Sequence, residues 1–85
     1  MDIVSTTIQA GNYEVIINNL NVRSIPSSTG AILSQLSKCS IVKLDGYSKM
    51  IDGYIWGRYT NSANQTCYIA VRKTNGIEYL KQRAI

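Results

Sequence analysis

The sequence predicts an all-β domain, a small barrel or sandwich, and three observations support this. The β-branched residues Ile, Val and Thr make up 23 of the 85 positions, and such side chains favour strands. The apolar segments are short and are separated by Gly, Asn, Asp or Pro, as in hairpin-connected strands. The chain has 85 residues and a mass of 9.4 kDa, which is large enough for one core and too small for two. It is 45% hydrophobic and 16% charged, so we expect it to fold compactly.

We expect eight strands, drawn from period-two alternation and short apolar runs. They span Tyr13–Ile17, Leu20–Arg23, Ala31–Leu36, Ile41–Leu44, Lys49–Ile51, Tyr54–Tyr59, Thr66–Arg72 and Ile77–Leu80. Residues 1–12 show no clean period, so we expect a linker or edge segment that adds little to the core. The domain proper is predicted at 13–85.

Turn residues lie between these segments. The loop Ile25–Gly30 contains Pro26, which fixes φ, and ends in a glycine that is free to adopt positive φ. Asp52-Gly53 separates two strands by two residues, which predicts a tight hairpin, and Asn75-Gly76 predicts another. Asp45-Gly46 is a further turn signal, and residues 61–65 form a longer hairpin loop.

Alternation also predicts which side chains face the core. Leu20 and Val22 fall on one face of their strand, and Asn21 and Arg23 fall on the other. The strand at 66–72 has one apolar face and one face that is available to a ligand. Cys67, Ile69 and Val71 lie on the first face, and Tyr68 and Arg72 on the second.

Catalytic chemistry has few candidates in this chain. There is no histidine, and Cys39 and Cys67 are separated by 27 residues, which excludes the common zinc spacings and every Ser-His-Asp or Cys-His arrangement. Asp45 and Asp52 precede glycine in turns, where an aspartate ordinarily bonds its local backbone. We therefore expect no enzyme activity, metal or cofactor, and two reduced thiols packed as small apolar side chains.

The charge balance is basic but diffuse. Nine Lys and Arg against five Asp and Glu give +4 and a pI near 9.3, which suits a polyanion such as nucleic acid or an anionic cell wall. Only Arg72 and Lys73 are adjacent, so a solvated surface is favoured over a functional patch. The sequence lacks a leader and any apolar run of 18 residues, so we expect cytoplasmic synthesis without a signal peptide and no membrane partner.

The aromatic residues point to binding. Phe is absent, and Trp56 is accompanied by six tyrosines, whose rings are apolar on the face and polar at the tip. Such rings suit half-exposed grooves. The alternative is that they merely cover the sheet and pair between strands, and Trp56 is expected to be partly buried.

Two motifs resemble the bacterial SH3 (SH3b) family, lysostaphin-type subgroup. The first is the stretch Leu20-Asn21-Val22-Arg23-Ser24-Ile25-Pro26. The second is Asp52-Gly53-Tyr54-Ile55-Trp56-Gly57-Arg58-Tyr59 followed by Cys67-Tyr68-Ile69-Ala70-Val71-Arg72. Their order and spacing agree with the subgroup, and the likeness runs from about Tyr13 to Leu80.

The resemblance implies an SH3-like β-barrel that binds Gram-positive peptidoglycan and cuts nothing. Such domains lie at the C-terminal ends of phage endolysins, bacteriocins and autolysins, where they hold a separate hydrolase domain at the wall. The implied partners are a peptidoglycan cross-bridge or a wall polysaccharide, and an endolysin catalytic domain. Self-association, or association with full-length endolysin, is a further possibility. The other hypothesis is an SH3-like barrel that binds nucleic acid through its basic surface.

The resemblance also implies a site. The ligand-binding residues carried over are Tyr47, Lys49, Tyr68 and Tyr79, with Asn12 and Tyr13 standing in for the subgroup's N-terminal segment. Tyr47 occupies a position where the subgroup has an acidic residue, residues 1–12 contain no aromatic, and the region around Asn75-Gly76 is shortened. These departures leave three ligands open: pentaglycine, a different cross-bridge and a wall polysaccharide.

Overall fold

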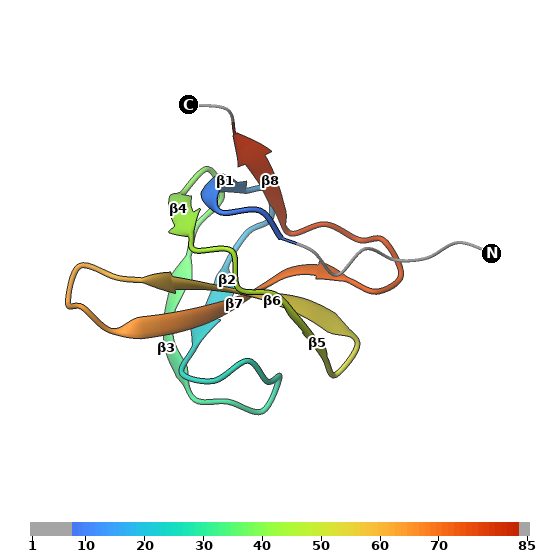
Figure 1. Cartoon of the computed structure of the whole chain (residues 1–85), viewed down its shortest axis with the longest axis horizontal. Coiled ribbons are helices and arrows are strands. Elements are labelled where there is room, and N and C mark those ends of the chain that lie inside the picture. The colour runs from blue at the N-terminus through green and yellow to red at the C-terminus, as the bar shows by residue number, and fades with distance from the viewer. Residues whose placement is uncertain (1–7, 84–85) are drawn as a thin grey trace.

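The computed structural model describes residues 8–83, and within that range it contains eight strands and no helix. The strands are β1 (Gly11–Val15), β2 (Leu20–Arg23), β3 (Ile32–Leu36), β4 (Ile41–Leu44), β5 (Lys49–Ile51), β6 (Tyr54–Thr60), β7 (Thr66–Lys73) and β8 (Leu80–Arg83). They form two antiparallel sheets, β4-β1-β8 and β3-β2-β7-β6-β5 (Figure 1). The all-β prediction is confirmed. None of residues 8–83 belongs to a helix able to cross a membrane.

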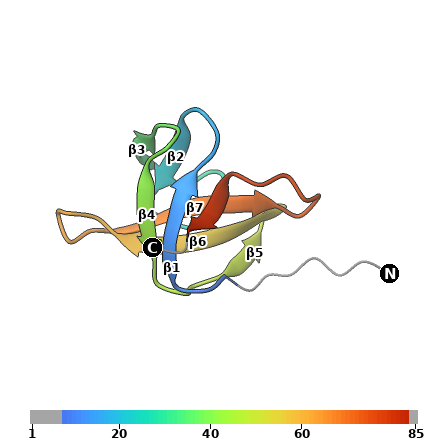
Figure 2. The ribbon, with the colours of Figure 1, turned by 90° about the horizontal axis from the view of Figure 1, so that it is seen from above.

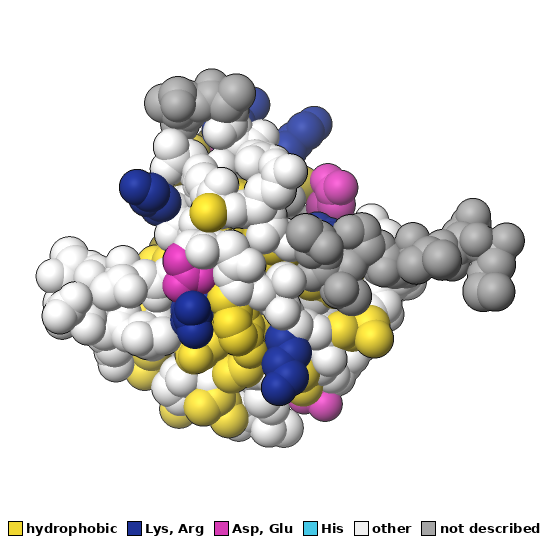
Figure 3. All heavy atoms as spheres, in the orientation of Figure 1, with side chains coloured by type: hydrophobic (Ala, Val, Ile, Leu, Met, Phe, Trp, Pro, Cys, Tyr) yellow, Lys and Arg dark blue, Asp and Glu magenta, His cyan; other side chains and the backbone are white. Residues whose placement is uncertain are grey.

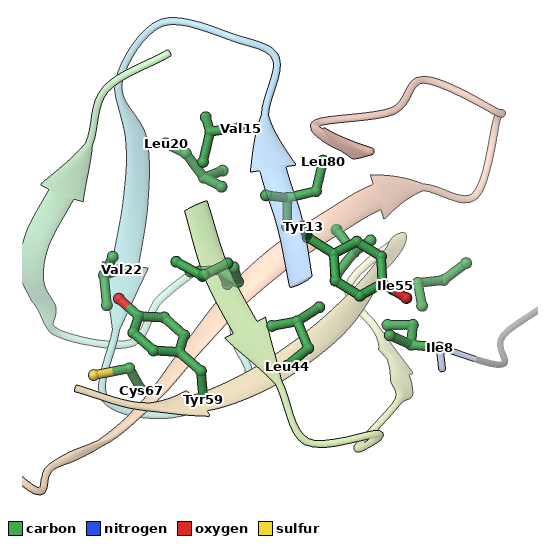
Figure 4. Packing of buried hydrophobic residues seen from close by; sticks show 13 residues of the cluster. Ile8, Tyr13, Val15, Leu20, Val22, Leu44, Ile55, Tyr59, Cys67 and Leu80 are labelled. Carbon is green, nitrogen blue, oxygen red and sulfur yellow. The ribbon is translucent and has the colours of Figure 1, made fainter. Parts of the chain in front are cut away.

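The core lies between the two sheets. Figure 2 shows β4 and β1 side by side, with β6 and β7 crossing behind them. Val15 and Leu44 from the smaller sheet and Val22, Ile55 and Ile69 from the larger one have no exposed surface (Figure 4). Fully burying a side chain of this kind contributes about 1.5–3 kcal/mol.

Gly57 lets the two sheets approach each other. A Cβ atom at Gly57 would lie 2.9 Å from Cγ2 of Val71 and 3.0 Å from Cδ1 of Leu44. These distances are shorter than carbon atoms tolerate without displacement, so the absence of a side chain in the middle of β6 is a packing requirement.

The first strand begins earlier than expected. β1 starts at Gly11 and ends at Val15, whereas the sequence predicted a strand over 13–17. Ile8 is 4% exposed and belongs to the core cluster, so the expectation that residues 1–12 add little to the core was wrong at this position. Ile8 is a single apolar residue ahead of β1, and no periodicity signals so isolated a contact. Residues 1–7 lie outside the described residues.

The last strand lies elsewhere than predicted. The sequence placed it at 77–80, but β8 spans 80–83 and pairs with β1 in the other sheet. After the Asn75-Gly76 turn the chain makes one isolated bridge with β7 and then crosses to the smaller sheet. At the crossing, Tyr79 N–H donates to Val71 O (2.9 Å) and Ile16 N–H donates to Tyr79 O (3.0 Å). The last strand therefore forms three residues later than predicted, because it pairs with the edge of β1 and not with β7.

A bulge changes the alternation of β7. The register between β6 and β7 shifts between Ile55 and Trp56, so that Trp56 pairs with Ala70 and Ile55 pairs with Arg72. Arg72 therefore lies opposite the fully buried Ile55 and not on the face of Tyr68, which corrects the prediction. The other face assignments in β2 and β7 are confirmed by the burial of Leu20, Val22, Cys67, Ile69 and Val71.

The tight hairpin predicted at Asp52-Gly53 is confirmed. β5 ends at Ile51 and β6 begins at Tyr54. Asp52 (φ 57°) and Gly53 (φ 77°) both adopt the left-handed conformation, as a type I′ turn requires. This turn fixes the register that pairs Lys49 with Trp56 and Ile51 with Tyr54.

Candidate ligand-binding face

The solvent side of the five-stranded sheet, here called the outer face, gathers the aromatic and basic side chains. Arg23, Tyr68 and Arg58 form one row across β2, β7 and β6, because directly paired residues point to the same side. Trp56 and Ala70 form the neighbouring row. Figure 3 shows hydrophobic side chains gathered over the lower, larger sheet with basic side chains on either side of them.

Four residues of this face form a connected group, the Tyr47 cluster: Asp45, Tyr47, Arg58 and Tyr68. The rings of Tyr47 and Tyr68 meet edge to face, with centroids 5.5 Å apart and planes at 73°. The Arg58 guanidinium carbon lies 4.8 Å from the centre of the Tyr47 ring. Both tyrosines are half-buried, so each ring packs on one side and meets solvent on the other.

Asp45 holds this cluster together. One carboxylate oxygen accepts a hydrogen bond from the Tyr47 backbone N–H (2.9 Å), and the other accepts one from Arg58 Nε (2.7 Å). Partial burial alone would raise the pKa of Asp45, but these hydrogen bonds and the positive charge of Arg58 outweigh it and lower the pKa. The carboxylate is therefore charged at neutral pH and fixes Tyr47 against Arg58.

A hollow of about 180 Å³, here called the Trp56 hollow, lies on the same face. Its walls include Tyr54, Trp56, Ala70 and Tyr79, together with polar side chains from β2 and from two loops: Asn19, Asn21, Arg23 and Ser28. Trp56 is 2% exposed, and its indole N–H donates to Ile51 O (3.0 Å). Trp56 is therefore buried more completely than predicted, and its ring forms a fixed wall of the hollow.

The tyrosines of the Trp56 hollow contact one another. The Tyr54 ring lies 5.9 Å from the Trp56 ring and 6.3 Å from the Tyr79 ring, measured between centroids. The Lys73 ammonium lies 5.7 Å from the centre of the Tyr54 ring. These rings and the asparagines Asn19 and Asn21 line the hollow together.

Asp52 ties one loop to the rim of this hollow. Its Oδ2 accepts hydrogen bonds from Ser27 Oγ (3.2 Å), Ser28 Oγ (3.2 Å) and Ser28 N–H (3.4 Å). Ser28 lines the hollow, and Arg23 Nη1 donates to Gly30 O (2.8 Å) at the other end of the loop. The 25–30 loop is thereby held against the 52–53 turn and against β2.

The structure brings together only part of the predicted site. Tyr47 and Tyr68 are in contact, Lys49 is exposed on the outer face opposite Trp56, and Tyr79 lines the Trp56 hollow. Tyr13 is 6% exposed and packs in the core, with its hydroxyl donating to Gln9 O (2.7 Å). Asn12 lies on the other sheet, between Lys43 and Arg83.

Tyr13 borders a separate hollow of about 570 Å³, away from the Tyr47 cluster, whose other walls are Gln9, Val71, Arg72, Glu78, Leu80, Lys81 and Gln82. Burial raises the pKa of the Tyr13 hydroxyl, although the charge of Arg72 and the bond to Gln9 act in the opposite direction. Tyr13 and the outer-face tyrosines therefore belong to different surfaces.

The sequence reasoning missed four contributors to the outer face: Asp45 in its link to Arg58, Arg58 itself, Tyr54 and Trp56. A usable signal was present, because residues 54, 56 and 58 follow the period of two and must share a face. Asp45 was assigned only its local turn bond, which it does make with the Tyr47 N–H. Its second partner lies 13 residues away and is invisible to local reasoning.

The described residues offer no metal or disulfide chemistry at this face. No group of three or more Cys, Asp or Glu within residues 8–83 is placed to hold a metal ion. Cys39 and Cys67 are free thiols. Cys67 packs in the core as expected, whereas Cys39 is exposed in the turn after β3, so the prediction of a packed thiol was wrong there.

Comparisons with known proteins identify the fold. No family model and no curated protein matches the chain. Lysostaphin, the antimicrobial peptidase from Staphylococcus simulans, superposes with a TM-score of 0.78 at 20% identity, over 88% of this chain and 32% of its own. The lysostaphin SH3b domain in a P4-G5 complex gives 0.75 at 18% identity, over 88% and 86%. The cell wall binding domain of the staphylococcal phage 2638A endolysin gives 0.69 at 19% identity, over 87% and 83%.

These similarities confirm the predicted SH3-like β-barrel fold. The chain spans about a third of the length of lysostaphin and most of the length of the two isolated domains. Two of these neighbours are an SH3b domain and a cell wall binding domain, and none of the three supports the nucleic-acid alternative.

Proposed function

We propose that this domain binds the peptidoglycan of Gram-positive bacteria without cutting it, and holds a hydrolase domain at its substrate. The observation that carries the proposal is the Tyr47 cluster: two half-exposed rings held on the outer face by the Asp45–Arg58 ion pair. The barrel that presents them is shared with domains described as binding the cell wall.

The cluster suits a slender peptide. A glycine-rich cross-bridge has little side-chain bulk, so its backbone can lie flat against the Tyr47 and Tyr68 rings, and each ring contributes roughly 0.5–1.5 kcal/mol of contact. The Arg58 guanidinium has five N–H donors, of which Nε bonds Asp45 and another bonds the Tyr68 hydroxyl. Its remaining donors, with the exposed Lys49 ammonium, would bond peptide carbonyls.

The Trp56 hollow extends the same face and would accept a second portion of the ligand. Its rings suit apolar side chains or sugar faces, and the amides of Asn19 and Asn21 would bond peptide or hydroxyl groups. Affinity on the order of micromolar is expected, because a flexible peptide loses conformational entropy when it is ordered. The hydrolase would be supplied by another domain. The match covers only 32% of lysostaphin, which leaves most of that protein outside the binding barrel.

Retention on purified Gram-positive sacculi tests the proposal. The wild-type chain should sediment with sacculi, Tyr68→Ala should lose most of that retention, and Tyr68→Phe should keep the ring contact and most of the binding. Lys38→Ala serves as the control, because Lys38 is an exposed turn residue outside this face. Equal retention of the wild type, Tyr68→Ala and a heat-denatured control would refute the proposed function.

A further inference from the structure

The solvent side of the smaller sheet carries a second set of charged residues. Tyr13, Val15, Val42, Leu44 and Leu80 are buried against the core, so the alternate residues of β1, β4 and β8 point outward. The outward charged and amide side chains, here called the basic face, are Asn12, Glu14, Lys43, Lys81 and Arg83.

The strand register sets out this face in two rows. Asn12 lies between Lys43 on β4 and Arg83 on β8, and Glu14 lies opposite Lys81. Adjacent strands are about 4.8 Å apart, so the backbones of Lys43 and Arg83 are separated by roughly 10 Å. In Figure 3, basic side chains project from the upper part of the molecule, where Figure 1 draws β1, β4 and β8.

The charge of the basic face is only partly neutralised. Arg83 forms an ion pair with Glu14. Lys43 and Lys81 form no ion pair with a carboxylate of residues 8–83. Both lysines are exposed. The three strands carry a net charge of +2, which is half of the formal +4 of the whole chain.

We propose that the basic face binds a linear anionic polymer whose units are joined by phosphodiesters. Hydrated lysine ammonium groups bind phosphate as point charges without a preformed pocket, and the Asn12 amide between two cations would donate to a phosphate oxygen. The exposed ammonium groups, spread over three adjacent strands, suit an extended, solvated chain.

The source of this polymer is the anionic component of the Gram-positive wall, and this part of the inference rests on the proposed function. Single-stranded nucleic acid is disfavoured because the outward residues of β1, β4 and β8 include no aromatic ring on which a base could stack. The basic face and the outer face lie on opposite sides of the core. Peptide and polymer would therefore bind at the same time and strengthen each other's attachment.

Binding to long-chain inorganic polyphosphate tests the electrostatic part. The double variant Lys43→Gln/Lys81→Gln should bind about tenfold more weakly than the wild type and show a shallower dependence of affinity on salt. Lys38→Gln removes one charge from a turn outside both faces and should retain nearly full affinity, whereas the single variants Lys43→Gln and Lys81→Gln should each lose affinity. Equal losses in Lys38→Gln and in these two single variants would overturn the assignment of a site, since only net charge would then matter.

Sacculi stripped of phosphodiester-linked polymers with hydrofluoric acid test the source. Stripping should weaken retention of the wild type and leave the Lys43→Gln/Lys81→Gln variant unchanged. On stripped sacculi, the difference in retention between the wild type and Tyr68→Ala reports the outer face alone. The absence of that difference would therefore show that the proposed function fails, independently of the basic face. The proposal is overturned if stripping leaves wild-type retention intact, or if single-stranded DNA binds more tightly than polyphosphate at the same lysines.

Discussion

Tyr59 and Tyr68 occupy neighbouring strands of one sheet and have opposite surroundings. Tyr59 in β6 faces the core and is 9% exposed, next to Cys67. Tyr68 in β7 faces the solvent side and contacts Tyr47. Side chains alternate between the two faces of each strand, so the inward Tyr59 follows the outward Arg58, and the outward Tyr68 follows the inward Cys67. The difference teaches that an inward tyrosine supports the barrel, whereas an outward one is available to a ligand.

Truncating the two rings should separate stability from binding most strongly. Tyr59→Ala leaves a cavity in the core and should lower the free energy of unfolding by about 3–5 kcal/mol. Tyr68→Ala removes a half-exposed ring and should cost no more than about 1 kcal/mol. Urea unfolding followed by tryptophan fluorescence measures both. Similar losses for the two variants would show that Tyr68 is also a core residue.

Alkaline titration should identify Tyr59 by its weak acidity. Burial, with a smaller contribution from Cys67, raises the pKa of Tyr59 to about 12, from an ordinary value of 10.0. A raised folded-state pKa gives a contribution to stability that is complete below the unfolded pKa and is lost as the pH rises from about 10 towards 12. Phenolate absorbance should show a late tyrosine that is absent in Tyr59→Phe, whereas Tyr68→Phe should keep it.

Wall binding should reverse the ranking of the two residues. Tyr68→Ala should weaken binding to sacculi about tenfold, corresponding to roughly 1.4 kcal/mol of lost ring contact. Tyr59→Phe keeps the inward ring, removes only its hydroxyl, and should bind as the wild type does. Sedimentation with sacculi at several protein concentrations gives the affinities. A stronger effect from Tyr59→Phe would place the ligand contact elsewhere.

The smallest effect is expected at Asp45, which positions the Tyr47 cluster without contributing a ring. Asp45→Asn removes the charge that holds Arg58 and should weaken sacculus binding about two- to fivefold. The pKa of the Asp45 carboxyl is lowered in the folded state. Its contribution to folding stability is therefore complete above its ordinary pKa of 3.8 and is lost as the pH falls through the folded-state pKa. NMR titration of the Asp45 carboxyl group measures this.

Local patterns anticipated much of the barrel. The segments 20–23, 41–44 and 49–51 were predicted with the bounds that the structure has, because alternation and turn residues are properties of neighbouring positions. The Asp52-Gly53 turn was equally accessible, since both residues tolerate positive φ. The pairing of β8 with β1 was not, because it joins residues between 65 (Val15 and Leu80) and 71 (Asn12 and Arg83) positions apart.

The candidate site was only partly accessible from the sequence. Tyr47 and Tyr68 came from the resemblance, and the structure places their rings in contact. Tyr13 carries the same side chain, yet its position in β1 turns it inward. The ion pair that holds the cluster joins Asp45 to Arg58 across the register of two separate segments, which composition and spacing do not reveal.

The amino-acid sequence by itself determined that the chain forms short strands, where they turn, and that no histidine-based chemistry is available, since these follow from residue types and their spacing. The tertiary structure alone decided which tyrosines face outward together, that a bulge moves Arg72 away from Tyr68, and that Lys43, Lys81 and Arg83 share one sheet. Those outcomes depend on strand register and on which edges pair, and both are set by contacts between distant parts of the chain.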